Sequence, residues 1–408
     1  MARTGFCDSR VLLDRKTDEA RFPLRAWANA CAVRERGVLG VGGEQKQQQE
    51  TDITEHRWVQ QLPLFAEAGI VVEIAQQSGS VVPAVERYEE EAVLNHLHGL
   101  QLGHTLRDLV PELVYREIER AMSKLGLLYD RTYTWDVFSD MMKSQQHLAL
   151  LSSELPKPFT ETTCAILVDW LIQVHCELQY LSFSITKQEA FNFSEETLYL
   201  AVHLLNRVLR EIKISISNLQ LVGVVCLFLA AKKEECLLPE VSELCYLMAN
   251  TYSRKQLLRM ERRVLCTLKF DLSHTPPIHF LLLSAYIARC GEKVICMARY
   301  LLELSLLEAK CVCFFPVQLA AAALRLARHL IQEPHTPESE AAWCIASTIY
   351  LGSEATLFTI MHIMATAAAR AHSQETRATF VKFSTKETLY VSLHPALKSA
   401  PCLLSLHT

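Results

Sequence analysis

The chain has 408 residues, of which half are hydrophobic and 21% are charged, and its formal net charge is −4. This length predicts two or three domains with a substantial core. The slightly acidic balance gives no electrostatic footprint for nucleic acid, which favours proteins with a basic patch or stripe. The fourteen cysteines follow no secretory leader, because the first ten residues lack an apolar run. We therefore expect reduced thiols in a soluble intracellular protein.

Residues 1–128 contain no recognisable domain motif and are predicted to form an N-terminal leader that is partly disordered. The segment Glu44–Asp52 has the composition of a polar linker. The apolar patch over residues 62–74 argues against disorder throughout the leader. Helical periodicity is present over residues 85–97 and again over residues 112–128.

From Tyr133 onward the periodicity is almost wholly helical, with no hairpin-turn signal. Residues 219–231 are apolar on every side but too few to cross a bilayer, which takes about twenty residues, so they predict a buried helix. The stretch Gln220–Lys232 is echoed by Gln318–Leu330, and an apolar helix precedes each. The echo indicates two similar helical domains. The natural joint is Thr275-Pro-Pro277, because proline disfavours helix just before it.

Searches for catalytic and metal-binding patterns find nothing persuasive. Gly40-Val-Gly-Gly43 lacks the spacing of a phosphate-binding loop. Cys311-Val-Cys313 has no second ligand pair at zinc spacing and favours buried helix cysteines. His175 and Cys176 are adjacent on a predicted helix, so their side chains do not face each other. We expect no enzyme activity, no cofactor and no metal.

A collinear series of motifs is the most informative feature of the chain. In order, the motifs are Cys164-Ala-Ile-Leu-Val-Asp-Trp-Leu-Ile-Gln-Val-His175, Glu196-Thr-Leu-Tyr-Leu-Ala-Val202, Leu219-Gln-Leu-Val-Gly223, Leu229-Ala-Ala-Lys232 followed by Glu234 and Glu235, Pro239-Glu-Val241, Leu258-Arg-Met-Glu261 and Leu268-Lys-Phe-Asp271. Such a series is far more specific than one short motif. The chain resembles the cyclins, regulatory subunits of cyclin-dependent kinases, as a divergent member of their A/B-like branch.

The resemblance implies an all-α fold of two tandem five-helix cyclin-box repeats, and it is stronger in the first. It places the first cyclin box, with a preceding helix, at residues 129–273 and the second repeat at 274–372. Residues 373–408 are then a C-terminal tail. The implied function is to bind and activate a cyclin-dependent serine/threonine kinase in cell-cycle control, in the nucleus or cytoplasm.

Two other functions compete with this one. A scaffold that keeps the cyclin fold but activates no kinase is the main alternative. A transcription-factor relative of the fold is the other, but the zinc ribbon and basic surfaces of that group are missing from this sequence. We expect no nucleic-acid or membrane partner.

Lys232 and Glu261 are the predicted kinase-binding residues. Most charges that flank apolar helices are simply solvated. In cyclins, however, the matching Lys and Glu form hydrogen bonds with the regulatory helix of the kinase, which holds that helix in its active position.

A second predicted contact with the kinase precedes the first repeat. Tyr133, Val137 and Met141 lie at i, i+4 and i+8, on one face of a helix. In A-type cyclins the matching helix packs against the kinase. The alternative is that it packs on the first repeat of its own chain, and we expect a part of both.

The resemblance also implies a shallow apolar groove that binds Arg-x-Leu segments of substrates and inhibitors. Its residues are Ile166, Leu167, Trp170, Leu219 and Gln220. A plain core role competes with this interpretation, because a large exposed apolar patch normally implies a partner. Thr163 stands where the family usually has Met, and Gln173 where it often has Glu, so we expect weak binding.

The chain departs from the family in two further ways. Cys164 and Asn206 replace an Arg and an Asp that pair in cyclins, and losing both partners of an ion pair can be nearly neutral. The segment Tyr180–Phe191 makes the first connection between helices about a dozen residues longer than the usual 4–6. The segment is either a native loop or a retained piece of an unspliced message.

Arg21, Leu24 and Asn29 fit the spacing Arg-x-x-Leu-x-x-x-x-Asn of the destruction box that marks mitotic cyclins for ubiquitination. Pro23 and the position near a terminus favour the extended, accessible segment that such a degron needs. Against it, three fixed residues recur by chance, and the nearest downstream lysine is Lys46.

Overall fold

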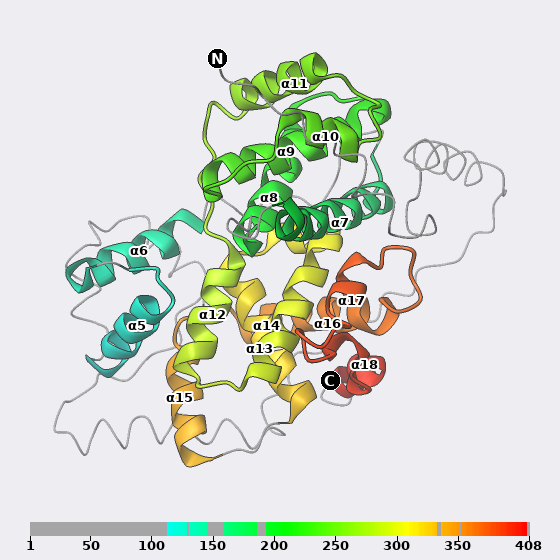
Figure 1. The fold of residues 1–408 in the computed structure, drawn as a ribbon. Helices are drawn as coiled ribbons and strands as arrows, with labels where there is room; N and C mark the ends of the chain where they lie inside the picture. Colours follow the sequence, from blue (N-terminus) through cyan, green and yellow to red (C-terminus); the bar gives the residue numbers. More distant parts are fainter. Residues whose placement is uncertain are drawn as a thin grey trace.

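The computed structural model describes residues 112–128, 130–145, 159–185, 193–332, 336–350 and 352–405. These segments are helical, with no strand among them (Figure 1). The predicted all-α class is confirmed. Two helical domains follow each other in the chain and lie side by side, with further helices packed around the second (Figure 1).

Five helices of the described chain build the first domain around one central helix. They are α7 (Glu161–Ile185), α8 (Glu195–Glu211), α9 (Leu219–Glu234), α10 (Val241–Leu247) and α11 (Arg254–Thr267). Helix α9 packs against α7, α8 and α11, and every residue from Leu219 to Ala231 is buried. This explains why its sequence is apolar on all sides.

Helix α9 is also the one described stretch that matches a membrane span in length and composition. The stretch is Ile216–Glu234, which adds the preceding 3₁₀ turn to α9, and 72% of its most apolar 18-residue window is buried inside the protein. Its surroundings are the other helices of the first domain. It is therefore the core helix that its sequence predicts.

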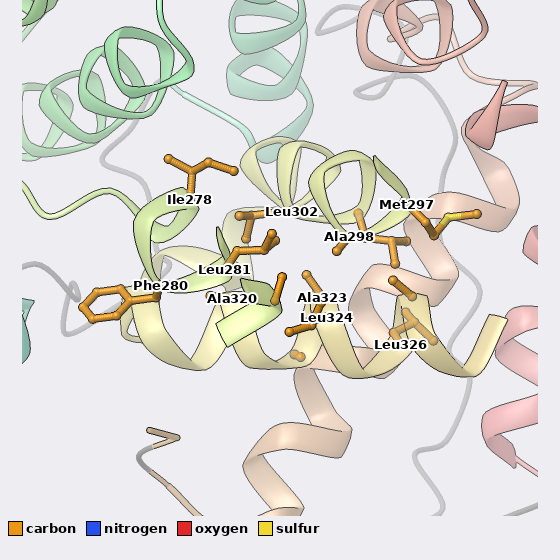
Figure 2. Packing of buried hydrophobic residues seen from close by; sticks show 14 of the residues in the cluster. Ile278, Phe280, Leu281, Met297, Ala298, Leu302, Ala320, Ala323, Leu324 and Leu326 are labelled. Atoms are coloured by element: carbon orange, nitrogen blue, oxygen red, sulfur yellow. The ribbon is translucent and has the colours of Figure 1, made fainter. Parts of the chain in front are cut away.

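The second domain repeats this arrangement. Its helices are α12 (Pro277–Ile287), α13 (Glu292–Leu304), α14 (Pro316–Ile331), α15 (Pro337–Ser347) and α16 (Glu354–Arg370). Figure 2 shows Ala320 and Ala323 of the central helix α14 facing Leu281 of α12 and Ala298 of α13. Small side chains allow the helices to approach closely. The echo in the sequence thus corresponds to α9 and α14, and the expectation of two similar five-helix domains is confirmed.

Two helices that precede the first domain in sequence pack on the second domain in space. They are α5 (Glu112–Lys124) and α6 (Thr134–Ser144). Ile118 of α5 and Trp135 of α6 belong to the second-domain core. The Ser144 hydroxyl lies 2.7 Å from that of Thr275. The expectation that the α6 helix packs on the first repeat is therefore corrected, because its apolar face is buried in the second domain.

The segment beyond residue 372 is packed rather than free. It forms α17 (Ala378–Lys382), a 3₁₀ turn (Val391–Leu393) and α18 (Ala396–Ser405). Phe383 and Leu397 are buried in the second-domain core. Helix α17 also packs on α7 of the first domain, where the Ala378 amide donates a 2.7 Å hydrogen bond to Asp169 Oδ1.

Two of the expectations from the sequence fall partly or wholly outside the described residues. Helix α7 continues to Ile185, so the first part of the long connection predicted at 180–191 is helical. The rest of that connection, residues 186–192, lies outside. The leader up to residue 111 lies outside as well, and with it Arg21, Leu24 and Asn29.

Candidate functional site

The structure brings Lys232 and Glu261 together as an ion pair between two helices of the first domain. Lys232 lies in the last turn of α9 and Glu261 in the middle of α11. Lys232 Nζ donates to Glu261 Oε1 at 2.5 Å. The ammonium also lies 4.3 Å from the centroid of the Phe228 ring, where a cation is attracted by the aromatic face. Sequence reasoning selected both residues but did not predict that they pair.

The ion pair stands at the border between core and solvent. The Lys232 side chain is 40% exposed and that of Glu261 is 11% exposed. An ammonium has three donors and a carboxylate has two acceptor oxygens, so this pair keeps free donors and a free acceptor oxygen after bonding to itself. The position of Lys232 at the C-terminal end of α9 also favours a positive charge. The site can therefore offer a donor and an acceptor to another backbone.

Exposed apolar side chains that were not predicted as site residues lie near the ion pair in sequence. Leu258 is one turn before Glu261 on α11, and Phe270 follows the end of that helix with 69% of its surface exposed. Phe270 has φ +59°, which is costly for a bulky residue. Both belong to motifs that carry the family resemblance, Leu258-Arg-Met-Glu261 and Leu268-Lys-Phe-Asp271. Membership in these motifs could have identified them as site residues from the sequence.

The three residues of the second predicted kinase contact differ in their exposure to solvent. Tyr133 ends a 3₁₀ turn before α6 and is 59% exposed. Val137 and Met141 are half-buried and pack against the second-domain core. Of the three, Tyr133 is the side chain most available to a partner.

The predicted docking groove is largely core in the free chain. Leu167, Leu219 and Gln220 are buried, while Ile166 and Trp170 are half-buried. The close approach of α7 to α9 explains the difference, because a Cβ at Gly223 would lie 3.1 Å from Leu167 Cδ1. Of the five residues predicted to line the shallow groove, Ile166 and Trp170 are therefore the accessible ones, and peptide docking there stays a prediction.

One polar group in this region has no partner. The Gln220 side-chain amide is buried, and its Nε2 has no hydrogen-bond acceptor among the described residues. A buried donor that makes no hydrogen bond is unfavourable.

Cys164 and Asn206, which replace the family's ion pair, line one small cavity together with Arg210. Its volume of about 20 Å³ is room for about one water molecule. Burial raises the pKa of Cys164 to about 11, so the thiol is neutral at physiological pH. An Arg210 Nη1–H donates to the Asn206 carbonyl at 2.8 Å. The two replacements are thus spatial neighbours, as a paired loss requires.

Glu235, another residue of the motifs, has a structural role. Its carboxylate accepts hydrogen bonds from the Ser194 amide at 2.8 Å and the Ser194 hydroxyl at 3.0 Å. The Thr197 hydroxyl donates to the same oxygen. These bonds hold the first turn of α8, where amide groups lack helical partners and a negative charge is favourable.

Within the described segments, no group of three or more His, Cys, Asp or Glu side chains is placed to hold a metal ion. Cys311, one of the two cysteines predicted to be buried in a helix, is buried, and burial raises its pKa. Cys313 is half-buried. The candidate site is therefore the protein surface around Lys232 and Glu261.

Comparison with known proteins gives matches over most of the described chain. The family described as "Cyclin, N-terminal domain" matches residues 136–273, and "Cyclin, C-terminal domain" matches residues 275–397. A G2/mitotic-specific cyclin-B2 from Rana japonica is 34% identical over 238 residues, which are 58% of this chain and 56% of that protein. A G2/mitotic-specific cyclin-B from Spisula solidissima is 33% identical over 58% of this chain and 50% of its own length.

The chain thus spans about half of the length of the curated relatives it matches. Among solved structures, a viral cyclin from herpesvirus saimiri is matched over 57% of this chain and 97% of its own, at 18% identity and a TM-score of 0.43.

Proposed function

This chain belongs to the cyclin family, and we propose that it binds and activates a cyclin-dependent serine/threonine kinase in cell-cycle control. The observation that carries the proposal is the surface ion pair of Lys232 and Glu261, 2.5 Å apart. The two residues occupy the motif positions where the resemblance predicts the kinase contact. B-type mitotic cyclins among the relatives support the same role.

The geometry suits a surface that selects one conformation of a kinase. Kinase activity requires the regulatory helix to be in place, so that its Glu pairs with the ATP-positioning Lys. A partner can shift that equilibrium only by binding the active arrangement more tightly. Lys232 and Glu261 would supply directional hydrogen bonds, and exposed Leu258 and Phe270 would supply apolar area.

A matched pair of double variants tests the contact. We expect Lys232→Ala with Glu261→Ala to abolish co-precipitation of the kinase. The control is Lys233→Ala with Glu234→Ala, which removes an ion pair of 2.9 Å one residue further along α9 and should leave co-precipitation unchanged. Circular dichroism and melting temperature report on folding in both, and removing both partners of a pair is often nearly neutral. Equal kinase binding by the two double variants would rule out the contact.

Activation needs its own measurement because binding alone does not imply it. We expect the precipitated complex to phosphorylate histone, and the Lys232/Glu261 variant to yield no such activity. A precipitate that contains the kinase but phosphorylates nothing would favour the scaffold alternative. The neutral neighbours Cys164 and Asn206, in place of the family's ion pair, are the feature that would then need explanation.

Two finer parts of the function are proposals that rest on fewer residues. Docking of Arg-x-Leu segments would use the narrow surface at Ile166 and Trp170, and the partial exposure of both side chains supports it. Timed destruction would use Arg21 and Leu24, which lie outside the described residues. If the level of the wild-type protein does not fall as cells leave mitosis, timed destruction is ruled out.

A further inference from the structure

The outer face of α11 carries a row of positive charges. We call Lys255, Arg259, Arg262 and Arg263 the cationic ridge, and all four residues are exposed. At 100° per residue they lie on the side of the helix opposite Leu257, which is buried in the core. Helix α11 lies at the outer end of the first domain, remote from the second (Figure 1).

No acidic side chain of the described residues lies within ion-pair distance of the cationic ridge. The single acid on α11, Glu261, is already paired with Lys232. The guanidinium of Arg263 has a 3.3 Å hydrogen bond to the Lys213 carbonyl, which leaves its charge uncompensated. By contrast, several arginines of the second domain pair with carboxylates, as Arg299 does with Glu195 at 2.9 Å and Arg325 with Glu354 at 2.8 Å.

The spacing of the ridge makes this charge unfavourable for the helix itself. Lys255 and Arg259 are four residues apart, as are Arg259 and Arg263, and like charges at this spacing destabilise a helix. They also concentrate positive potential on one side of a chain whose net charge is −4. An anionic partner would relieve the repulsion. Guanidinium groups suit carboxylates in particular because they bind them through two parallel hydrogen bonds.

We propose that the cationic ridge is a docking surface for an acidic protein segment rich in Asp and Glu. The ridge from Lys255 to Arg263 spans eight residue rises, about 12 Å, which matches three or four residues of an extended peptide at about 3.3 Å each. Helix α11 contains no aromatic residue on which an unpaired base could stack. The acidic balance of the whole chain also disfavours a long polyanion. A peptide is therefore the better fit than nucleic acid.

The test measures binding of the full chain to a fluorescein-labelled octaglutamate peptide by fluorescence polarisation at low salt. The ridge variant is Arg259→Gln, Arg262→Gln and Arg263→Gln, because glutamine removes the charge, stays polar and keeps helix propensity. The matched control is Lys293→Gln, Lys310→Gln and Lys386→Gln, which removes the same charge from exposed positions of the second domain and its C-terminal extension. We expect a loss of roughly tenfold in affinity for the ridge variant and less than twofold for the control.

Three outcomes would overturn the proposal. The first is an equal loss in both variants, which would show that only net charge matters. The second is undetectable binding of the peptide to the wild type. The third is tighter, ridge-dependent binding of a labelled eight-nucleotide oligothymidylate, which would make the surface a nucleic-acid site. A charge-swapped chain with Arg259→Glu, Arg262→Glu and Arg263→Glu should instead bind labelled octalysine. No kinase is present in the assay, so its result is independent of the proposed function.

Discussion

At the scale of single residues, the Lys232–Glu261 pair is unequal. Glu261 is mostly buried, whereas two-fifths of the Lys232 side chain is in solvent. Removing the lysine alone leaves a carboxylate that is shielded from water and lacks its partner. Removing both leaves no such group.

This asymmetry predicts how the free energy of unfolding changes in the single and double variants. Lys232→Ala should lower the free energy of unfolding by about 1 kcal/mol, a modest figure because solvent screens an exposed ammonium. Lys232→Ala combined with Glu261→Ala should cost less than the single change. Urea unfolding of both variants measures the two values, and a double variant less stable than the single one would contradict the account.

Residue identity could be predicted from the sequence better than residue contacts. Lys232 and Glu261 stand out because they occupy positions in the motifs that carry the family resemblance, but they are 29 positions apart, and only packing of α9 on α11 brings them together. The helical stripe of Ile166 and Leu167 was also predictable. How closely α9 covers that stripe depends on Gly223. The periodicity of the sequence does not contain that information.

At the scale of elements, α5 defines where the N-terminal region can be cut. Ile118, Ala121 and Met122 of this helix are buried against the second domain. Deletion of residues 1–128 should therefore give a melting temperature several degrees below that of a chain lacking only residues 1–111, since burying one large apolar side chain contributes about 1.5–3 kcal/mol. Differential scanning calorimetry compares the two. Identical melting temperatures would show that α5 contributes nothing to the fold.

Removal of the C-terminal segment after residue 372 should destabilise the second domain, whereas removal of a loose tail would not. A chain that ends at residue 372 should lose cooperative unfolding of the second domain, because Phe383, Val391 and Leu397 fill its core. A chain that ends at residue 405 serves as the control and should unfold like the full protein. Near-ultraviolet circular dichroism during heating reports on the packing in each. A sharp transition in the shorter chain would refute the packed role.

Elements with strong periodicity were predictable, and short docked elements were not. The apolar helices α9 and α14 appear in the sequence as an echo, because each is central to a five-helix domain. Helix α17 has only five residues and is fixed by contacts with α7 and α13. Its sequence resembles a tail because tertiary contacts rather than propensity specify it.

At the scale of the whole molecule, buried histidines should set the acid side of the stability curve. Burial holds the pKa of His175 and of His203 at about 3, and it lowers that of His274 well below 6.5. The rings of His203 and His274 stack 4.6 Å apart at the joint between the domains. All three are neutral in the folded chain.

The sign of the pH dependence follows from linkage. Unfolded histidines bind protons below about pH 6.5, whereas the folded ones do not, so stability is fully present above pH 6.5 and falls as the pH drops. Each histidine contributes a slope of up to about 1.4 kcal/mol per pH unit. His203→Phe with His274→Phe should flatten the decline between pH 6.5 and 5 in urea unfolding. An unchanged slope would show that these two groups are not responsible.

The hydrogen bond from Ala378 to Asp169 joins residues 209 positions apart, and this separation has a consequence for synthesis. Ribosomes release α7 early, and N-terminal domains generally begin folding as soon as they emerge. Gln173, on the same helix, can donate to Asp169 Oδ2 at once, but the second donor, the Ala378 amide, is synthesised 209 residues later. We therefore expect a nascent chain halted before α17 to contain a folded first domain whose α7 surface is uncovered. That surface should become protected from proteases only after α17 has been synthesised.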